Sequence, residues 1–451
     1  MGGASESFYQ KNTLNLSFNK NHNIVTMKIK SILSIFLLAI SSFAFAQNTY
    51  HLGIEGFDWG PNANKVIIPL GSTQKEISAA DFQIFVKRSS TQGEIPAAVA
   101  AGKRDILTAF ISDEKGFKTE SGNFATLLLT VGPTNSIASP IQYFRTGGNK
   151  WIDYNLTILN AKTGQIWNKE SSRSLGLTDK FDVSGKFSHK DINLTYGLFK
   201  PTTAKEKVPL LIWLHGGGEG GTDPTIAIIG NKANNYASDA IQTIFEGAYV
   251  LAPQTPTRWM HSVSNGSTSG KENDIYNEAL FALIQDVVKN NPGIDASRIY
   301  LGGCSNGGYM SLKLIFLHPE YFAAGYISAL AYKSEFATDA DIQKIKNVPI
   351  WFVHSKDDNT TKPDETVVPM YNRLKAAGAK NTYLSYYDHV TDVTGVFGGE
   401  NFQYMGHWSW IYSHDNRASK DMDGSPVKVN GKPVTIMEWL AAQKLPTGKK
   451  K

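Results

Sequence analysis

The chain has 451 residues, a formal net charge of +5, 41% hydrophobic residues, 19% charged residues and one cysteine. This length and composition are typical of a globular protein with more than one domain. The single cysteine excludes an intramolecular disulfide, and the small net charge does not favour a nucleic-acid-binding protein.

The start of the chain has the features of a targeting signal. Met27-Lys28-Ile29-Lys30 is basic, residues 32–43 are largely apolar, and residues 44–46 form an Ala-x-Ala cleavage site. We therefore expect an upstream extension at 1–26, a signal peptide at 27–46 cleaved after Ala46, and a secreted or periplasmic protein. The apolar run is shorter than the roughly 20 residues of a spanning helix, so we expect no stable membrane insertion.

Residues 47–160 read as short strands separated by turns. Residues 151–159 give the clearest pattern, because apolar Ile152, Tyr154, Leu156 and Ile158 alternate with polar residues. Further strands are expected at 66–70, 82–87, 106–112 and 124–131. This pattern predicts an all-β immunoglobulin-like sandwich, followed by a polar connector at 161–190. Because its strands hold no set of Ser, His and acid, we expect it to shape substrate access or stability.

From residue 191 to 447 the pattern changes to alternating strands and helices. Apolar strands are expected at 208–214, 299–301 and 348–354, and a helix is expected at 312–317. A helical stripe precedes the second of these strands, formed by Leu280, Leu283, Ile284, Val287 and Val288. The alternation predicts a mostly parallel sheet with helices on both faces.

The sequence Gly303-Cys304-Ser305-Asn306-Gly307 joins a predicted strand to a predicted helix. This is the context of a nucleophile elbow, in which the sharp turn leaves room only for glycine two positions from the serine. Ser305 is therefore the predicted nucleophile. Cys304 is expected to be a small buried side chain.

A glycine-rich loop, His215-Gly216-Gly217-Gly218-Glu219-Gly220-Gly221, directly follows the strand at 208–214. No Gly-Lys-Ser/Thr follows it, as a phosphate-binding loop would require. Such a loop is typical of an oxyanion hole, because glycines allow backbone N–H groups to approach a developing negative charge. The predicted donors are the N–H groups of Gly217 and Asn306.

The acid and the base are expected further along, in the order Ser, Asp, His. Asp357 and Asp358 follow the strand at 348–354; Asp358 is favoured and Asp357 is the alternative. The candidate bases are His389, His407 and His414, of which His407 is favoured because a loop-like stretch at 394–405 precedes it, and His389 is its main rival. Four side chains are candidates for an acyl or aromatic pocket: Trp259, Met260, Trp408 and Trp410.

Three segments give the chain a resemblance to a known family: Leu214 to Gly221, Gly302 to Met310 and Gly406 to Tyr412. Residues 195–445 resemble secreted α/β-hydrolases of the esterase, feruloyl-esterase and polyhydroxybutyrate-depolymerase-like group. Most of the mature chain is similar to two-domain bacterial esterases of the EstA type. The resemblance implies an immunoglobulin-like domain before the hydrolase and an acid four residues after His354.

These features predict a serine carboxylic-ester hydrolase that acts through an acyl-enzyme, on short-chain, carbohydrate-linked or aromatic esters. The alternatives are a prolyl-oligopeptidase-type peptidase and a noncatalytic carbohydrate-binding or adhesion protein. The histidines have no His-Glu-x-x-His spacing and there is no cysteine pair, so we expect neither a metal nor another cofactor. No nucleic-acid partner is expected.

Overall fold

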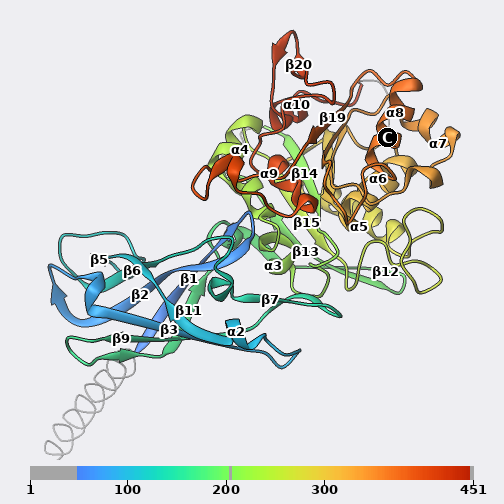
Figure 1. The fold of residues 1–451 in the computed structure, drawn as a ribbon. Coiled ribbons are helices and arrows are strands. Elements are labelled where there is room, and N and C mark those ends of the chain that lie inside the picture. The colour runs from blue at the N-terminus through green and yellow to red at the C-terminus, as the bar shows by residue number, and fades with distance from the viewer. Residues whose placement is uncertain (1–47, 203–205, 447–451) are drawn as a thin grey trace, which may run out of the picture.

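The computed structural model describes residues 48–202 and 206–446, which fold into an all-β part and an α/β part that lie against each other (Figure 1). The predicted upstream extension and signal peptide fall outside the described residues. Within the described residues, no helix has the length and apolar character needed to cross a membrane.

Two sheets form the first part, which we call the sandwich. Their strand orders are β11-β1-β2-β6-β5 and β10-β9-β3-β4. Buried side chains from both sheets meet in one core, where Leu156 and Ile158 of one sheet share the interior with Val66 and Leu127 of the other. The strands are β1 (Thr49–Phe57), β2 (Gly60–Gln74), β3 (Phe82–Ser89), β4 (Ala101–Arg104), β5 (Ile106–Ser112), β6 (Gly122–Leu129), β9 (Asp153–Asn160), β10 (Ile166–Trp167) and β11 (Lys169–Ser174).

The hairpin β7 (Ile141–Phe144) and β8 (Gly148–Trp151) stands apart from both sheets of the sandwich. Its strands pair only with each other among the described strands. A short helix, α2 (Ala97–Ala100), lies before β4. The sequence pattern correctly predicted strands within β2, β3, β5, β6 and β9. It missed β1, which also contributes to the sandwich core, and it gave no indication of this hairpin.

The segment 161–190 differs from the expected connector. It contains β10 and β11, which belong to the sandwich, and β12 (Phe181–His189), which belongs to the second part. β11 pairs in parallel with β1 at a sheet edge, where a strand of Lys, Glu, Ser and Arg needs no apolar face. The two parts are joined through the short 3-10 turn Gly176–Lys180.

An eight-stranded sheet with the order β12-β13-β15-β14-β16-β17-β18-β19 forms the second part. We call it the hydrolase part after the sequence resemblance described above. β13 runs antiparallel to both of its neighbours, and the remaining pairs in this sheet are parallel. The predicted mostly parallel sheet is therefore confirmed. Its further strands are β13 (Ile192–Phe199), β14 (Val208–Leu214), β15 (Tyr249–Gln254), β16 (Ile294–Cys304), β17 (Ala324–Ser328), β18 (Ile350–Ser355) and β19 (Thr382–Tyr387).

Helices cover both faces of this sheet. Leu210, Ile212 and Leu214 of β14 pack in one core with α5, α6, α7 and α8, while Leu211 and Trp213 pack in the other with α4, α9 and α10. A strand buried on both faces explains the continuous apolar sequence of β14. The helices are α3 (Pro224–Ile229), α4 (Asp239–Phe245), α5 (Asn277–Asn290), α6 (Asn306–Leu317), α7 (Asp339–Ile345), α8 (Val367–Ala376), α9 (Trp410–His414) and α10 (Ile436–Ala441), and a small hairpin comprises β20 (Lys428–Val429) and β21 (Lys432–Pro433).

The sandwich and the hydrolase part share buried contacts. In α3, Ile228 packs in the core of the hydrolase part, whereas its neighbour Ile229 packs in the sandwich core. The ammonium of Lys232 lies 2.7 Å from carboxylate oxygens of both Asp58, in the sandwich, and Asp415, in the hydrolase part. These contacts place the end of β1 directly beside the hydrolase part.

Candidate active site

Ser305 occupies a sharp turn between β16 and α6. Its backbone has φ 54° and ψ −113°, a strained conformation for a residue other than glycine. A Cβ atom on Gly303 would lie 2.7 Å from the carbonyl oxygen of Leu214, and one on Gly307 would overlap the same oxygen. The flanking glycines therefore let β14 and the start of α6 come close together, as the elbow prediction requires. Cys304 is fully buried.

Asp358 lies in the turn after β18 and is held by a dense set of donors. Its Oδ1 accepts hydrogen bonds from the backbone N–H groups of Thr360 (2.8 Å) and Thr361 (2.9 Å). Its Oδ2 accepts from the Thr361 hydroxyl (2.7 Å) and from Nδ1 of His407 (2.8 Å). These hydrogen bonds fix the carboxylate in one orientation, with Oδ2 directed at His407.

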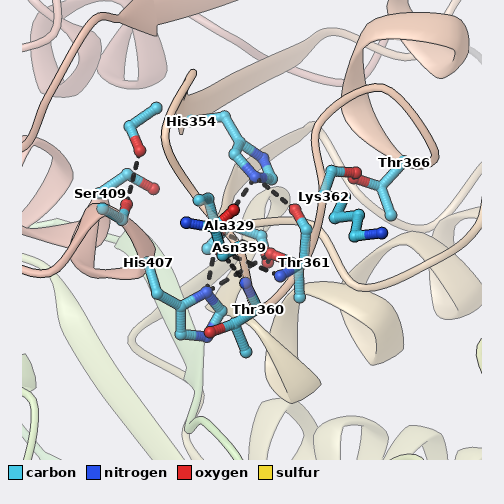
Figure 2. Close-up of polar contacts among 12 residues, drawn as sticks. Ala329, His354, Asn359, Thr360, Thr361, Lys362, Thr366, His407 and Ser409 are labelled. Atoms are coloured by element: carbon cyan, nitrogen blue, oxygen red, sulfur yellow. Dashed lines mark hydrogen bonds and ion pairs between the residues drawn. The ribbon is translucent and has the colours of Figure 1, made fainter.

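A second histidine contacts the same carboxylate. Nε2 of the fully buried His354 lies 3.1 Å from Asp358 Oδ2 and 2.9 Å from the carbonyl oxygen of Thr361. Figure 2 shows the rings of His354 and His407 approaching the turn of Thr360 and Thr361 from two sides. Burial alone would raise the pKa of Asp358, but hydrogen bonds from the two histidines lower it well below its usual range.

The histidine bonded to Asp358 lies on the wall of a cavity. His407 sits in the 3-10 turn Gly406–Trp408, and its Nδ1 must carry a proton to donate to the carboxylate. Its Nε2 is then the basic nitrogen. His407 and Ser305 both line the same cavity, which has a volume of about 850 Å³.

The alternative acid and base form a separate pair. Nδ1 of His389 lies 2.9 Å from Oδ2 of Asp357, and 46% of the His389 side chain is exposed. Neither residue lines the cavity that contains Ser305. The third candidate, His414, is buried against Trp213 and Tyr236, and within the described residues neither ring nitrogen has a hydrogen-bond partner.

The glycine-rich loop follows β14 and reaches the elbow. A Cβ on Gly217 would lie 3.8 Å from Nδ2 of Asn306, so these two predicted donors are neighbours. The Asn306 side chain accepts a hydrogen bond from the N–H of Met260 (3.1 Å), and its own backbone N–H, as the first of α6, has no partner within the helix. The loop can therefore present N–H groups to an anion beside Ser305.

Backbone groups contact both ring nitrogens of His215, at the start of the loop. Its Nδ1 lies 2.6 Å from the Gly216 carbonyl oxygen, and its Nε2 accepts from the N–H of Thr255 (3.3 Å). Burial lowers the pKa of His215 to about 4, so the ring is neutral and fixed.

The walls of the cavity come from both parts of the chain. The hydrolase part contributes the predicted Met260, Trp408 and Trp410. Trp259 does not line the cavity; it is fully buried and packs on His215 and Tyr276, because it lies in a turn in which the N–H of His261 donates to the carbonyl oxygen of Arg258 and the indole faces the core. The sandwich wall was not foreseen from the sequence and includes Trp59, Asn62, Arg88, Asn135, Gln142, Tyr143 and Asn149.

Among residues 48–202 and 206–446, no group of three or more potential metal ligands occurs. The site contains a serine at a strained turn, a histidine held by a buried carboxylate, and backbone donors beside the serine. The fold and this arrangement are those of an α/β-hydrolase.

Comparison with protein families identifies both parts. Residues 50–170 match the esterase Ig-like N-terminal domain, and residues 201–396 match the phospholipase/carboxylesterase family. The chain is therefore a serine hydrolase of the carboxylesterase type that carries an N-terminal Ig-like domain. The second match includes Ser305 and Asp358 and ends before His407.

Among solved structures, a thermostable esterase is similar over 88% of this chain and 99% of its own, with a TM-score of 0.68 and 21% identity. An acylaminoacyl peptidase from Pyrococcus horikoshii is similar over 67% of this chain and 47% of its own (TM-score 0.37, 17% identity). Est1E from Butyrivibrio proteoclasticus is similar over 46% of this chain and 92% of its own (TM-score 0.34, 16% identity). The first similarity supports the shared two-part fold. No curated protein matches the chain significantly.

Proposed function

We propose that the protein hydrolyses carboxylic esters with Ser305 as nucleophile, His407 as general base and acid, and Asp358 as the acid that orients the histidine. The observation that carries this proposal is the 2.8 Å bond from His407 Nδ1 to the buried Asp358, on the wall of the cavity that also contains Ser305. Backbone N–H groups of Gly217 and Asn306 supply the oxyanion hole.

In the proposed reaction, Ser305 Oγ attacks the ester carbonyl carbon while His407 Nε2 takes the hydroxyl proton. Asp358 stabilises the imidazolium, and the two N–H groups stabilise the tetrahedral oxyanion. The bond to the alcohol oxygen then breaks, and that oxygen leaves with the proton from His407. Water attacks the acyl-enzyme by the same steps and releases the acid, which regenerates Ser305.

For the substrate, we propose a short-chain ester or an ester linked to a carbohydrate or an aromatic group. The cavity is large enough for more than a small acyl group, and its two-part wall combines indole rings with amide and guanidinium groups. Aromatic rings pack on the apolar faces of sugars or phenyl groups, while amides bind hydroxyls. We propose a secreted or periplasmic location and no nucleic-acid partner.

The test is turnover of a panel containing nitrophenyl esters, feruloylated sugars and Pro-containing peptides by the mature protein and by Ser305→Ala. Ester turnover that falls by at least about 10³ in Ser305→Ala, with unchanged thermal unfolding, supports the proposal. Preferential peptide cleavage would identify a peptidase instead. Binding of sugars without turnover of any ester would identify a noncatalytic binding protein.

A further inference from the structure

The hairpin β7–β8 of the sandwich contacts the glycine-rich loop of the hydrolase part. The backbone N–H of Asn149 donates to the carbonyl oxygen of Gly218 (2.6 Å), and Asn149 Nδ2 donates to Oε1 of Glu219 (2.8 Å). Nζ of Lys150 lies 3.4 Å from the carbonyl oxygen of Gly220. Three consecutive residues of the loop are therefore bound by two consecutive residues of the hairpin.

The backbones meet so closely that the hairpin needs a glycine at the contact. Gly148 has φ +73°, and a Cβ atom on it would overlap the carbonyl group of Gly218. This close approach gives the Asn149 N–H its short bond to Gly218.

Glu219 links the hairpin to the interior of the hydrolase part. Its side chain is buried, with Oε2 accepting from Asn231 Nδ2 (3.0 Å), and its backbone carbonyl accepts from Gln254 Nε2 (2.9 Å). Oε1 is the oxygen that Asn149 satisfies. A buried carboxylate oxygen without a donor is unfavourable, so the loop is expected to shift if this donor is lost.

We propose that Asn149 is a positioning residue that the sandwich supplies to the active site of the hydrolase part. By binding Gly218 and Glu219, it holds the loop in the position where the N–H of the adjacent Gly217 meets the oxyanion. Asn149 acts through the loop and takes no part in proton transfer. The inference rests on the proposed ester hydrolysis.

The physical reason for a kinetic effect is the sensitivity of an oxyanion hole to the position of its donors. A donor stabilises the transition state only where charge develops, and its removal costs about 10²–10³ in kcat. Displacement by a fraction of an ångström weakens the same interaction in the transition state more than it weakens binding of the neutral ester.

The experiment compares the full-length protein with Asn149→Ala and with Arg145→Ala, an exposed residue in the turn of the same hairpin. Steady-state kinetics are measured on an acetyl ester and on a bulky ester. We expect Asn149→Ala to lower kcat about tenfold or more on both esters, with KM within about threefold of the parent value. Arg145→Ala is expected to retain parent kinetics.

An exchange of hydrogen-bonding roles tests the pair directly. Asn149→Asp alone places two carboxyl groups against each other and is expected to lower kcat. Glu219→Gln alone keeps a carbonyl oxygen that accepts from Asn149 Nδ2, so it is expected to lower kcat less. The double variant Asn149→Asp, Glu219→Gln restores one donor and one acceptor, and its side chain at 219 can still accept from Asn231. We expect kcat of the double variant to exceed that of Asn149→Asp alone, because the amide introduced at position 219 donates to the new carboxylate.

Unchanged kcat in Asn149→Ala, or an increase in KM on the bulky ester alone, would overturn the inference, because the second result describes a simple pocket wall. Additive losses in the double variant would also overturn it. If the parent protein hydrolyses no ester, the proposed function fails instead, and this outcome is recognised before any variant is compared.

Discussion

Two aspartates that are adjacent in sequence bind two different histidines. Asp358 turns inward, because the N–H groups of Thr360 and Thr361 bind its Oδ1, and it meets His407. Asp357 turns outward to His389. Both pairs have ordinary hydrogen-bond lengths, so their difference lies in burial and in their position relative to Ser305.

Substitution of the two histidines separates the pairs by activity. We expect His407→Ala to lower kcat by at least about 10³, because the serine loses its base, and His389→Ala to stay within about threefold of the parent. The measurement is hydrolysis of a short-chain nitrophenyl ester at saturating concentration. The reverse ranking would transfer the base to His389.

The buried carboxyl of Glu219 makes stability depend on pH. Burial raises its pKa from 4.5 to about 7, despite hydrogen bonds from Asn149 and Asn231 that act in the opposite direction. A raised folded-state pKa means that the stabilisation is complete below the unfolded value of about 4.5 and is lost as pH rises through about 7. The nearby Cys304 thiol stays neutral, since burial raises its pKa as well.

We therefore expect the thermal midpoint of the parent protein, relative to Glu219→Gln, to fall as pH rises from 5 to 8. Each unit of pKa shift corresponds to about 1.4 kcal/mol, so the change is measurable by calorimetry. A difference in midpoint that stays constant across this range would show that Glu219 has the same protonation state folded and unfolded.

At the residue scale, sequence patterns pointed to Ser305, Asp358 and His407 because each belongs to a local motif. They favoured Asp358 but left Asp357 open as the alternative, since the turn that points one inward and the other outward is set by contacts with Thr361 and His407. The prediction that Trp259 lines the pocket was wrong, because a tryptophan next to a loop has the same local sequence pattern whether its side chain faces a cavity or the core. Asn149 carried no signal at all, because its partners are distant in sequence.

At the scale of elements, the elbow depends on the close packing of β14 against the start of α6. We expect Gly307→Ala to unfold the hydrolase part or lower its midpoint by many degrees, because the added Cβ meets the backbone oxygens of Leu214 and His215, which cannot move aside.

Gly217→Ala is the matched control for the elbow. A Cβ at Gly217 has ordinary contacts of 3.8 Å or more, so we expect its thermal midpoint to stay close to that of the parent. The two variants are compared by thermal unfolding. Equal midpoints would contradict the steric explanation of the elbow.

The strands β9 and β14 were predictable from the sequence, whereas the edge strands β11 and β12 were not. β9 alternates apolar and polar residues and β14 is continuously apolar, so each has a clear pattern. β11, with the sequence Lys-Glu-Ser-Ser-Arg-Ser, forms a strand because it pairs with β1, and no local property indicates this. β12 alternates half-buried and exposed residues around Ser, Gly and Lys, a composition that also suits a loop.

At the scale of the whole molecule, Lys232 joins the two parts. Its ammonium is shared by Asp58 and Asp415, and burial together with the nearby Asp415 raises the pKa of Asp58 to about 7 despite the opposite effect of Lys232. We expect Lys232→Met to lower the free energy of unfolding by about 3–5 kcal/mol, since the buried Asp58 and the partly buried Asp415 lose their counter-ion.

Lys190→Met is the control for this prediction. Lys190 also forms a short ion pair, with Glu278, but both side chains are more than half exposed. Exposed pairs contribute little to stability, because water and salt screen the two charges, so the midpoint should hardly change. Both variants are measured by denaturant unfolding. Similar losses of unfolding free energy would mean that the burial of Lys232, Asp58 and Asp415 does not increase the contribution of their ion pairs to stability.

The position of Ile229 in the sandwich core has a consequence for synthesis of the chain. A ribosome releases the sandwich strands first, yet their core lacks Ile229 until α3 has also emerged, and Asp58 lacks Lys232 until then. We therefore expect the nascent sandwich to expose the core side chains that Ile229 covers, while translation continues through β13 and β14. A pause in translation before α3 is expected to prolong the period in which chaperones or proteases can reach these side chains.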